Sequence, residues 1–219
     1  MADRGALENR IDELERRLAL VEDEREIARI QNIYGFYLDN RMWGEISGLF
    51  AEDGEIEIGR RGGYRGRGRV RRFLEEVLGQ GRWGLLPQEI INHIQLQMVI
   101  TVAPDRRTAK MRSRALVQGN SPPGQSRMLL AEGVYENDYV REDRRWLIRR
   151  LWWAPTYYFT VPGFETAVFE SGPVSADFPP DTPPRSPHPG LGRDFPPFHY
   201  DHPVTGAAPP IPASAPDGG

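Results

Sequence analysis

The chain has 219 residues, a formal net charge of −3 and no cysteine. This length suits one globular domain with extensions. The charge argues against nucleic-acid binding, and the missing cysteine excludes disulfides, thiolate metal sites and a cysteine nucleophile. The first 25 residues lack a continuous apolar stretch and no segment approaches a membrane span, so we expect a cytoplasmic protein that contacts neither membrane nor nucleic acid.

The first predicted element is a helix over residues 6–24 with heptad spacing. Such spacing forms one apolar seam, as in a coiled coil, although it lasts less than three heptads here. Two interpretations stay open: the seam docks on the chain's own domain, or it joins copies of the chain. The seam residues are Leu7, Ile11, Leu14, Leu18 and Val21.

The helical pattern continues through residues 27–38, and a second short helix is expected around Trp43. Residues 55–58 alternate as a strand. A basic, glycine-rich segment at 60–68 then leads into a helix over 70–78. A single short copy of this segment in an acidic chain favours solvated arginines over RNA binding, and it lacks the GK[ST] ending of a phosphate loop.

From about residue 89 the hydrophobic period changes to two, which predicts an antiparallel meander ending with strands at 127–140 and 145–154. Helices followed by such a meander indicate an α+β fold. Residues 171–219 contain 14 of the 20 prolines, so we expect an extended or disordered arm there, with its aromatic residues favouring partial packing. We divide the chain into a helical extension (1–23), a domain (24–160) and a proline-rich arm (161–219).

Three proton-handling side chains stand out: Tyr34, Asp39 and His93. Tyr34 and Asp39 lie five residues apart, about 140° around an ideal helix, so they share a site only if the helix ends or distorts near Asp39. An imidazole beside a carboxylate or phenol acts as a general base or acid near pH 7. The plainer alternative is a core tyrosine, a helix-end aspartate and a structural histidine.

No metal or cofactor is expected from the sequence. The segment His199-Tyr200-Asp201-His202 has ligand-type side chains, but nothing in the sequence fixes their geometry. No GxSxG, HExxH or GxGxxG motif occurs. In the last predicted strand, alternation places Trp146, Ile148, Arg150 and Trp152 on one face, which suits a pocket for a flat, hydroxylated ligand.

Residues 24–155 resemble the SnoaL-like branch of the nuclear transport factor 2-like superfamily. The matching stretches come in order at residues 30–39, 42–54, 64–66, 92–93 and 145–148. The resemblance implies a cone, formed by a curved antiparallel sheet and closed by N-terminal helices around a deep pocket. Members include dehydratases, isomerases, cyclases and non-catalytic relatives.

In bile-acid and scytalone dehydratase-like members, a tyrosine, an aspartate and a histidine act without a cofactor. The resemblance carries these catalytic roles to Tyr34, Asp39 and His93. It also implies an arginine on the last strand, with Arg150 the nearest match and Arg149 still open. Together with aromatic walls, this gives four candidate substrate-binding residues: Arg150, Trp43, Trp152 and Tyr37.

The long N-terminal helix and the proline-rich tail look like those of SnoaL-like lyases that act on lignin-derived aromatics. We therefore predict a cofactor-independent lyase that eliminates water, with or without formaldehyde, from a hydroxylated aromatic substrate such as a diarylpropane diol. Two alternatives stay open: a structural β-type subunit of a ring-hydroxylating dioxygenase, and a non-catalytic small-molecule binder. Because dimers and trimers both occur in the superfamily, we expect a homo-oligomer of one of these sizes.

Overall fold

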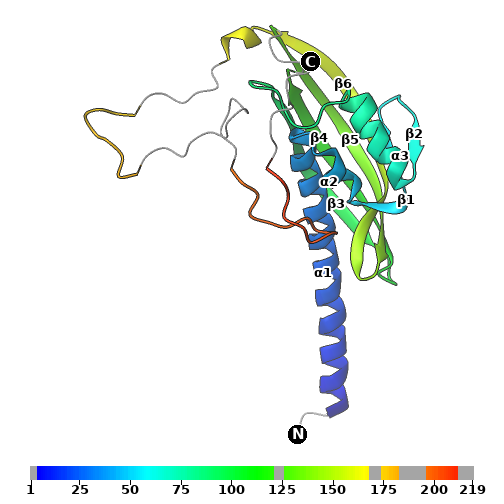
Figure 1. The fold of residues 1–219 in the computed structure, drawn as a ribbon. Helices are drawn as coiled ribbons and strands as arrows, with labels where there is room; N and C mark the ends of the chain where they lie inside the picture. The colour runs from blue at the N-terminus through cyan, green and yellow to red at the C-terminus, as the bar shows by residue number, and fades with distance from the viewer. Residues whose placement is uncertain (1–3, 121–125, 168–173, 183–195, 212–219) are drawn as a thin grey trace.

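A long helix and a curved six-stranded sheet make up most of the fold (Figure 1). The computed structural model describes residues 4–120, 126–167, 174–182 and 196–211. The elements in chain order are α1 (Arg4–Asp39), α2 (Trp43–Ser47), β1 (Phe50–Ile58), β2 (Gly63–Arg65), α3 (Arg67–Arg72), the π-helical turn η1 (Phe73–Leu78), β3 (Ile91–Val102), β4 (Thr108–Gly119), β5 (Arg127–Glu142), β6 (Arg145–Pro162) and the short η2 (Phe164–Thr166).

The strands lie in the order β2-β1-β6-β5-β4-β3. Strands β3 to β6 form the expected antiparallel meander, whereas β1 pairs with β6 in parallel. The predicted α+β class is confirmed, but the sheet is mixed rather than wholly antiparallel. β5 and β6 also run further than predicted, and the added length of β6 forms part of the cavity described below.

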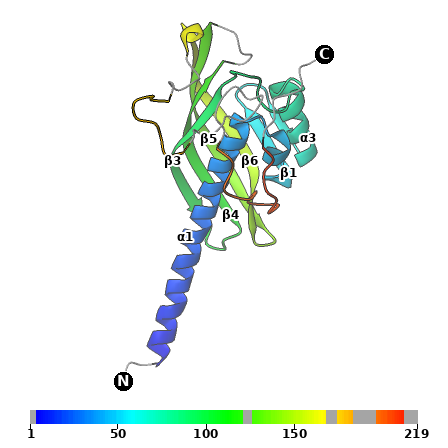
Figure 2. The ribbon, with the colours of Figure 1, turned by 60° about the vertical axis from the view of Figure 1, so that its left-hand side comes forward.

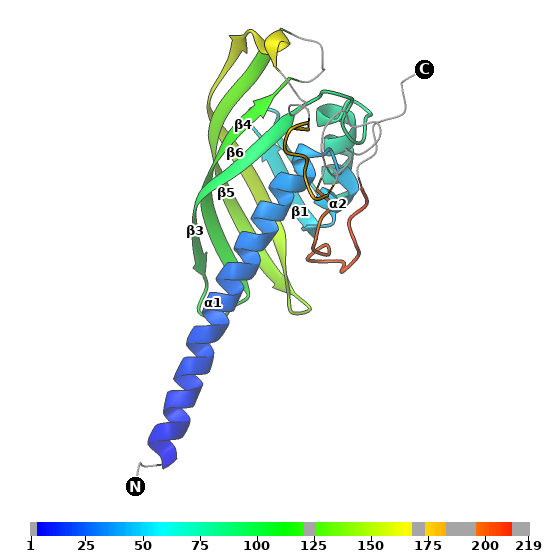
Figure 3. The same ribbon diagram turned by 90° about the vertical axis from the view of Figure 1, so that its left-hand side faces the viewer.

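Irregular pairing bends the sheet into an open cone (Figure 3). The register shifts between Leu96 and Val99 on β3, where Gln97 has a φ of 52°. Two more shifts occur between β5 and β6. An extra residue in one strand bends it and increases its twist. The sheet therefore curves around the C-terminal half of α1 instead of lying flat.

Only the second half of α1 belongs to the hydrophobic core. From Asp23 onward its apolar side chains are buried, except for the exposed Phe36, and the helix packs chiefly on β3. Before Asp23 the helix extends beyond the sheet (Figures 1 and 2). The five seam residues named above are each 51–58 % exposed, so within the described residues the seam does not dock on its own domain.

Asp23 fixes the point at which α1 meets the domain. Its carboxylate accepts hydrogen bonds from Trp146 Nε1 at 3.0 Å and Arg106 Nε at 2.5 Å, and it lies 3.2 Å from Arg141. Burial alone would raise the pKa of Asp23, but these hydrogen bonds and the arginine charges hold it below its usual value. The ionised carboxylate thus anchors the helix to the sheet.

Part of the proline-rich arm packs on the domain. Residues 196–211, which we call the strap, lie beside α1 and α2, and His202 within them is 4 % exposed. His202 Nε2–H donates to the Glu45 carbonyl at 2.8 Å, and its ring stacks on Tyr37 with centroids 5.7 Å apart. The aromatic residues of the strap therefore add to the core, as their spacing suggested. No helix in the described ranges has both the length and the apolar character needed to cross a membrane.

Candidate active site

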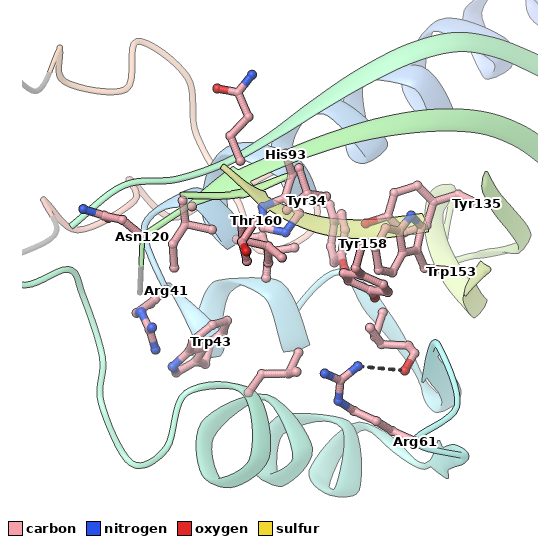
Figure 4. Close-up of a pocket in the computed structure, with 18 of the residues that line it drawn as sticks. Tyr34, Arg41, Trp43, Arg61, His93, Asn120, Tyr135, Trp153, Tyr158 and Thr160 are labelled. Carbon is pink, nitrogen blue, oxygen red and sulfur yellow. Dashed lines mark hydrogen bonds between the residues drawn. The ribbon is translucent and has the colours of Figure 1, made fainter. Parts of the chain in front are cut away.

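A cavity of about 420 Å³ opens between the concave face of the sheet, the end of α1 and the short helices α2 and η1 (Figure 4). This volume lies within the range of small-molecule sites. Among the described residues, no aspartate or glutamate lines it. The lining side chains that carry the argument are His93, the aromatic Tyr34, Trp43, Tyr135, Trp153 and Tyr158, and the basic Arg41, Arg61 and Arg127.

The Asp39 carboxylate holds His93 in one orientation. Its Oδ1 accepts a hydrogen bond from the His93 backbone N–H at 2.6 Å and lies 3.0 Å from Nδ1 of the ring. A carboxylate only accepts, so Nδ1 carries the hydrogen, and in the neutral imidazole Nε2 keeps its lone pair. Nε2 makes no hydrogen bond to a described residue, and His93 lines the cavity. This nitrogen is therefore the one available to a bound molecule.

The end of α1 makes this contact possible. The helix ends at Asp39, and Arg41 leaves it with a φ of 51° in the left-handed region. One turn earlier, Gly35 lets the helix approach β3 closely, because a Cβ there would lie 3.1 Å from the His93 carbonyl oxygen. Asp39 thus reaches His93 from outside the cavity, while Tyr34 faces the cavity itself.

Two buried phenols line the cavity: Tyr34 lies beside the imidazole and Tyr135 lies further along, next to Trp153 (Figure 4). The rings of Tyr34 and Tyr135 meet edge to face with centroids 5.9 Å apart. The Tyr34 hydroxyl lies against Tyr135 but makes no geometrically satisfactory hydrogen bond to any described residue. Burial raises the pKa of both phenols far above the usual value of 10, and the Asp39 carboxylate raises that of Tyr34 further. Both stay neutral near pH 7 and can donate a hydrogen bond.

A polar network supports β3 beneath this group. Gln31 is fully buried and donates from Nε2 to Gln95 Oε1 at 2.9 Å. Its own Oε1 accepts from Asn137 Nδ2 at 2.9 Å and from the Tyr139 hydroxyl at 3.0 Å. Buried amides with satisfied hydrogen bonds fix the relative positions of the elements that carry them. The strand bearing His93 is thereby tied to α1 and β5.

Arginines supply the formal positive charge at the cavity. Arg61 donates to the Ile58 carbonyl at 3.2 Å, the dashed line in Figure 4, and Arg127 Nε donates to Thr160 Oγ1 at 2.9 Å. In the described part of the chain, neither forms an ion pair with a carboxylate. Arg41 differs, because it is buried and its Nη2 lies 2.9 Å from Glu89 Oε1. Arg61 and Arg127 are thus exposed cations at the cavity.

The structure brings together Tyr34, Asp39, His93 and Trp43 but leaves three predicted residues outside the cavity. Tyr37 packs against the strap. Arg150 is on the outer face of β6, where its Nε lies 3.1 Å from Asp138, and Trp152 is on the same face, 37 % exposed. Arg149, the open alternative, pairs with Asp53 at the surface.

A bulge on β6 explains this difference. Tyr139 pairs with Ile148 and Asp138 with Arg150, so Arg149 is an extra residue. One extra residue reverses which side chains face inward, from that point to the second register shift at Thr156. Trp153 therefore lines the cavity in place of Trp152. Tyr135, Trp153, Tyr158, Arg61 and Arg127 were not identified from the sequence; only the aromatic run of residues 152–159 gave a signal.

A metal centre finds no support in the described residues, which contain no group of three or more histidine, aspartate or glutamate side chains placed to hold an ion. His202, from the ligand-type segment noted above, is instead occupied by backbone groups. Its Nδ1 accepts from the N–H groups of Val204 and Thr205, each at 3.1 Å. Its role in the described structure is to fix the strap.

A comparison of the chain with known protein families identifies the family to which it belongs. The chain matches the SnoaL-like domain over residues 19–151, which is more than half its length. The chain belongs to the SnoaL-like family. The resemblance and the cone fold inferred from the sequence are thereby confirmed, with β1 as the parallel exception. No curated protein sequence matches the chain.

Several solved structures have a fold similar to that of this chain. A candidate scytalone dehydratase from Novosphingobium aromaticivorans is 25 % identical, with a TM-score of 0.54, covering 64 % of this chain and 88 % of that one. A nuclear transport factor 2-like protein of the same organism is 21 % identical (TM-score 0.54; 71 % and 92 % covered). The hexachlorocyclohexane dehydrochlorinase LinA-type3 from Novosphingobium barchaimii is also 21 % identical (TM-score 0.54; 68 % and 94 % covered). At 21 % identity, the similarity to the last two structures shows only that the fold is shared.

Proposed function

We propose that this chain is a cofactor-independent acid–base lyase that eliminates water from a hydroxylated aromatic substrate. The observation that carries the proposal is the Asp39–His93 contact, which orients the imidazole and leaves Nε2 available to the cavity. The neutral phenols of Tyr34 and Tyr135, which line the same cavity, supply hydrogen-bond donors. The candidate scytalone dehydratase among the similar structures supports elimination chemistry.

The proposed elimination of water uses only side chains of the site described above. His93 Nε2 takes a proton from a carbon next to the carbinol carbon, and the C–H electron pair becomes the new C=C bond. As the C–O bond breaks, negative charge develops on the departing oxygen, and the Tyr34 hydroxyl donates a hydrogen bond to it. The imidazolium then returns the proton to this oxygen, which leaves as water. Asp39 stabilises the imidazolium while the charge exists.

An aromatic substrate follows from the walls of the cavity. Trp43, Trp153 and Tyr158 present flat surfaces on which an aryl ring can stack. A para-phenol on that ring would help a benzylic hydroxyl to leave, because its electrons can form a quinone methide. The positive charges of Arg61 and Arg127, with no carboxylate among the described lining residues, favour neutral or anionic phenols over cationic substrates.

The specific substrate that we propose is a diarylpropane diol. His93 takes the proton of the para-phenol, the benzylic C–O bond breaks to give a quinone methide, and the departing hydroxyl leaves as water with the proton that the imidazolium returns. The same base then takes the proton of the primary hydroxyl, and the C–C bond breaks to release formaldehyde. The bonding pair forms the C=C bond of a diaryl alkene and returns the ring to a phenolate, which takes the proton back from the imidazolium to become a phenol. Both steps are acid–base steps, so no oxidant or reductant is required.

Two alternatives from the sequence predict different geometry or partners. A non-catalytic binder has no need for an aspartate that aligns the histidine, so the 3.0 Å contact favours the enzyme. A structural dioxygenase subunit would co-purify with a larger iron–sulfur protein. We expect no such partner when the chain is purified from its native host.

The test is a screen of hydroxylated diarylpropanes with the purified chain, read by mass spectrometry for loss of water or formaldehyde. His93→Ala should lower kcat by about 10²- to 10⁴-fold, and added imidazole should restore part of it. Thr101→Ala, an exposed change on the same strand, is the matched control and should keep full activity. Binding without turnover in the wild type, or full activity in His93→Ala, would contradict the proposal.

A further inference from the structure

The projecting half of α1 carries an exposed apolar seam with a regular charge pattern on either side. In heptad positions abcdefg, Ile11 and Leu18 occupy a, while Leu7, Leu14 and Val21 occupy d. The residue before each a position, g, is an arginine at Arg10 and Arg17. The residue after each d position, e, is a glutamate in all three heptads, at Glu8, Glu15 and Glu22.

We propose that this segment forms a parallel two-stranded coiled coil with a second copy of the same chain. In a parallel pair, g of one helix faces e of the next heptad in the partner, so each g arginine meets an e glutamate. In an antiparallel pair g faces g and e faces e, which sets like charges against each other. Isoleucine at a (Ile11) with leucine at d (Leu7, Leu14) favours two parallel strands.

The charges that would make these contacts form no ion pair within the described single chain. Arg10, Arg17, Glu15 and Glu22 form no ion pair with a described residue. Other charges of the same segment do pair within the helix, such as Arg16 with Glu13 at 2.8 Å. Charged side chains at e and g positions commonly set orientation in coiled coils through contacts between helices.

The domain leaves the seam accessible. Asp23 faces the sheet from position f, on the opposite side of the helix from a and d, so the domain does not cover the seam. Further along, Tyr200 of the strap lies over Arg29, with the guanidinium 5.5 Å from the ring centroid. The strap thus marks where the partner helix must end. A parallel pair places both cavities at the same end of the coil.

Mass in solution tests the interface. Light scattering on the full chain should give twice the 24.9 kDa chain mass, and Leu14→Asp should halve it, because two buried aspartates would face each other in the seam. Leu14 is 51 % exposed in the single chain, so the cone should stay folded. Asn9→Asp, at position f, is the control with the same added charge. A monomeric wild type, or an unchanged mass in Leu14→Asp, would overturn the proposal.

Disulfide trapping tests the orientation, and the cysteine-free chain gives a clean background. Leu7→Cys places two thiols side by side in a parallel pair but about 20 Å apart in an antiparallel one. We expect covalent dimers on oxidation of Leu7→Cys and none with Asn9→Cys. Reversing Arg10 and Arg17 to glutamate should weaken the dimer, and adding Glu15→Arg and Glu22→Arg should restore it. Failure of both Leu7→Cys trapping and this rescue would exclude the parallel arrangement.

Discussion

At the scale of single residues, the Asp39 carboxylate does two separable things to His93: it orients the ring and supplies negative charge. Both hydrogen bonds use Oδ1, which asparagine also possesses. Asp39→Asn can therefore retain the orientation while losing the charge. Asp39→Ala loses both.

We expect kcat to fall by about 10- to 100-fold in Asp39→Asn, because a hydrogen bond to a charged group contributes about 1.5–3 kcal/mol. Asp39→Ala should lower kcat further, into the range of about 10²- to 10⁴-fold. KM should change little in either variant, since Asp39 does not line the cavity. Steady-state kinetics on the substrate from the screen measure this series. Equal losses in both variants would contradict a separate role for the charge.

Tyr34 provides the second prediction at this scale. Its buried hydroxyl lacks a satisfactory hydrogen bond, so Tyr34→Phe leaves no partner unsatisfied and removes a desolvated polar group. The melting temperature should therefore stay the same or rise. kcat should nevertheless fall by about 10²- to 10³-fold if the hydroxyl stabilises the departing oxygen. A lower melting temperature with unchanged kcat would assign Tyr34 to the core instead.

At the scale of elements, the distance between α1 and β3 decides whether the acid–base pair exists. Gly35→Ala would favour the helix intrinsically, but the new methyl would crowd the His93 carbonyl and Gln95 side chain, each 3.1 Å away. We expect β3 to move by a few tenths of an ångström and kcat to fall by about 10-fold, since catalysis is sensitive to placement. Kinetics and a melting curve measure the two effects separately.

Gly68→Ala is the matched control for this prediction. Gly68 also lies in a helix, but a Cβ there would meet nothing within 4 Å. It should stabilise the fold by about 0.5–1 kcal/mol and leave kcat unchanged. Wild-type kinetics in Gly35→Ala would show that the helix–strand distance does not limit catalysis.

At the scale of the whole molecule, His202 makes the attachment of the strap depend on pH. Burial lowers the pKa of His202, and its Nδ1 accepts two backbone hydrogen bonds that a proton there would break. The unfolded chain binds this proton near pH 6.5 and the folded chain only at lower pH. The contribution of neutral His202 is therefore fully present above about pH 6.5 and declines below it, by at most about 1.4 kcal/mol per pH unit.

We expect the protection of residues 196–211 against hydrogen exchange, measured relative to the intrinsic rate at each pH, to fall between pH 7 and pH 5. The melting temperature should also fall over this interval. His202→Gln, which keeps a donor and an acceptor but does not titrate, should have a weaker pH dependence of both. An equal pH response in the variant would mean that another group controls the strap.

Much of the fold was predictable from periodicity. The change from helical spacing to alternation near residue 89 gave the α+β class, and ordered stretches such as residues 42–54 gave the family. The substrate-binding residues were less predictable. Periodicity sets which residues share a face between irregularities, but the extra residue at Arg149 reverses the faces of β6, and no local signal marks it.

The sequence by itself determined which side chains this protein has available: a heptad seam with arginine at g and glutamate at e, and a phenol, a carboxylate and an imidazole of family-like spacing. Only the tertiary structure decided which of them meet. Asp39 and His93 lie 54 positions apart, and their contact depends on a helix end, a close approach at Gly35 and a bent sheet. Those distances arise from packing between elements, which a one-dimensional pattern does not encode.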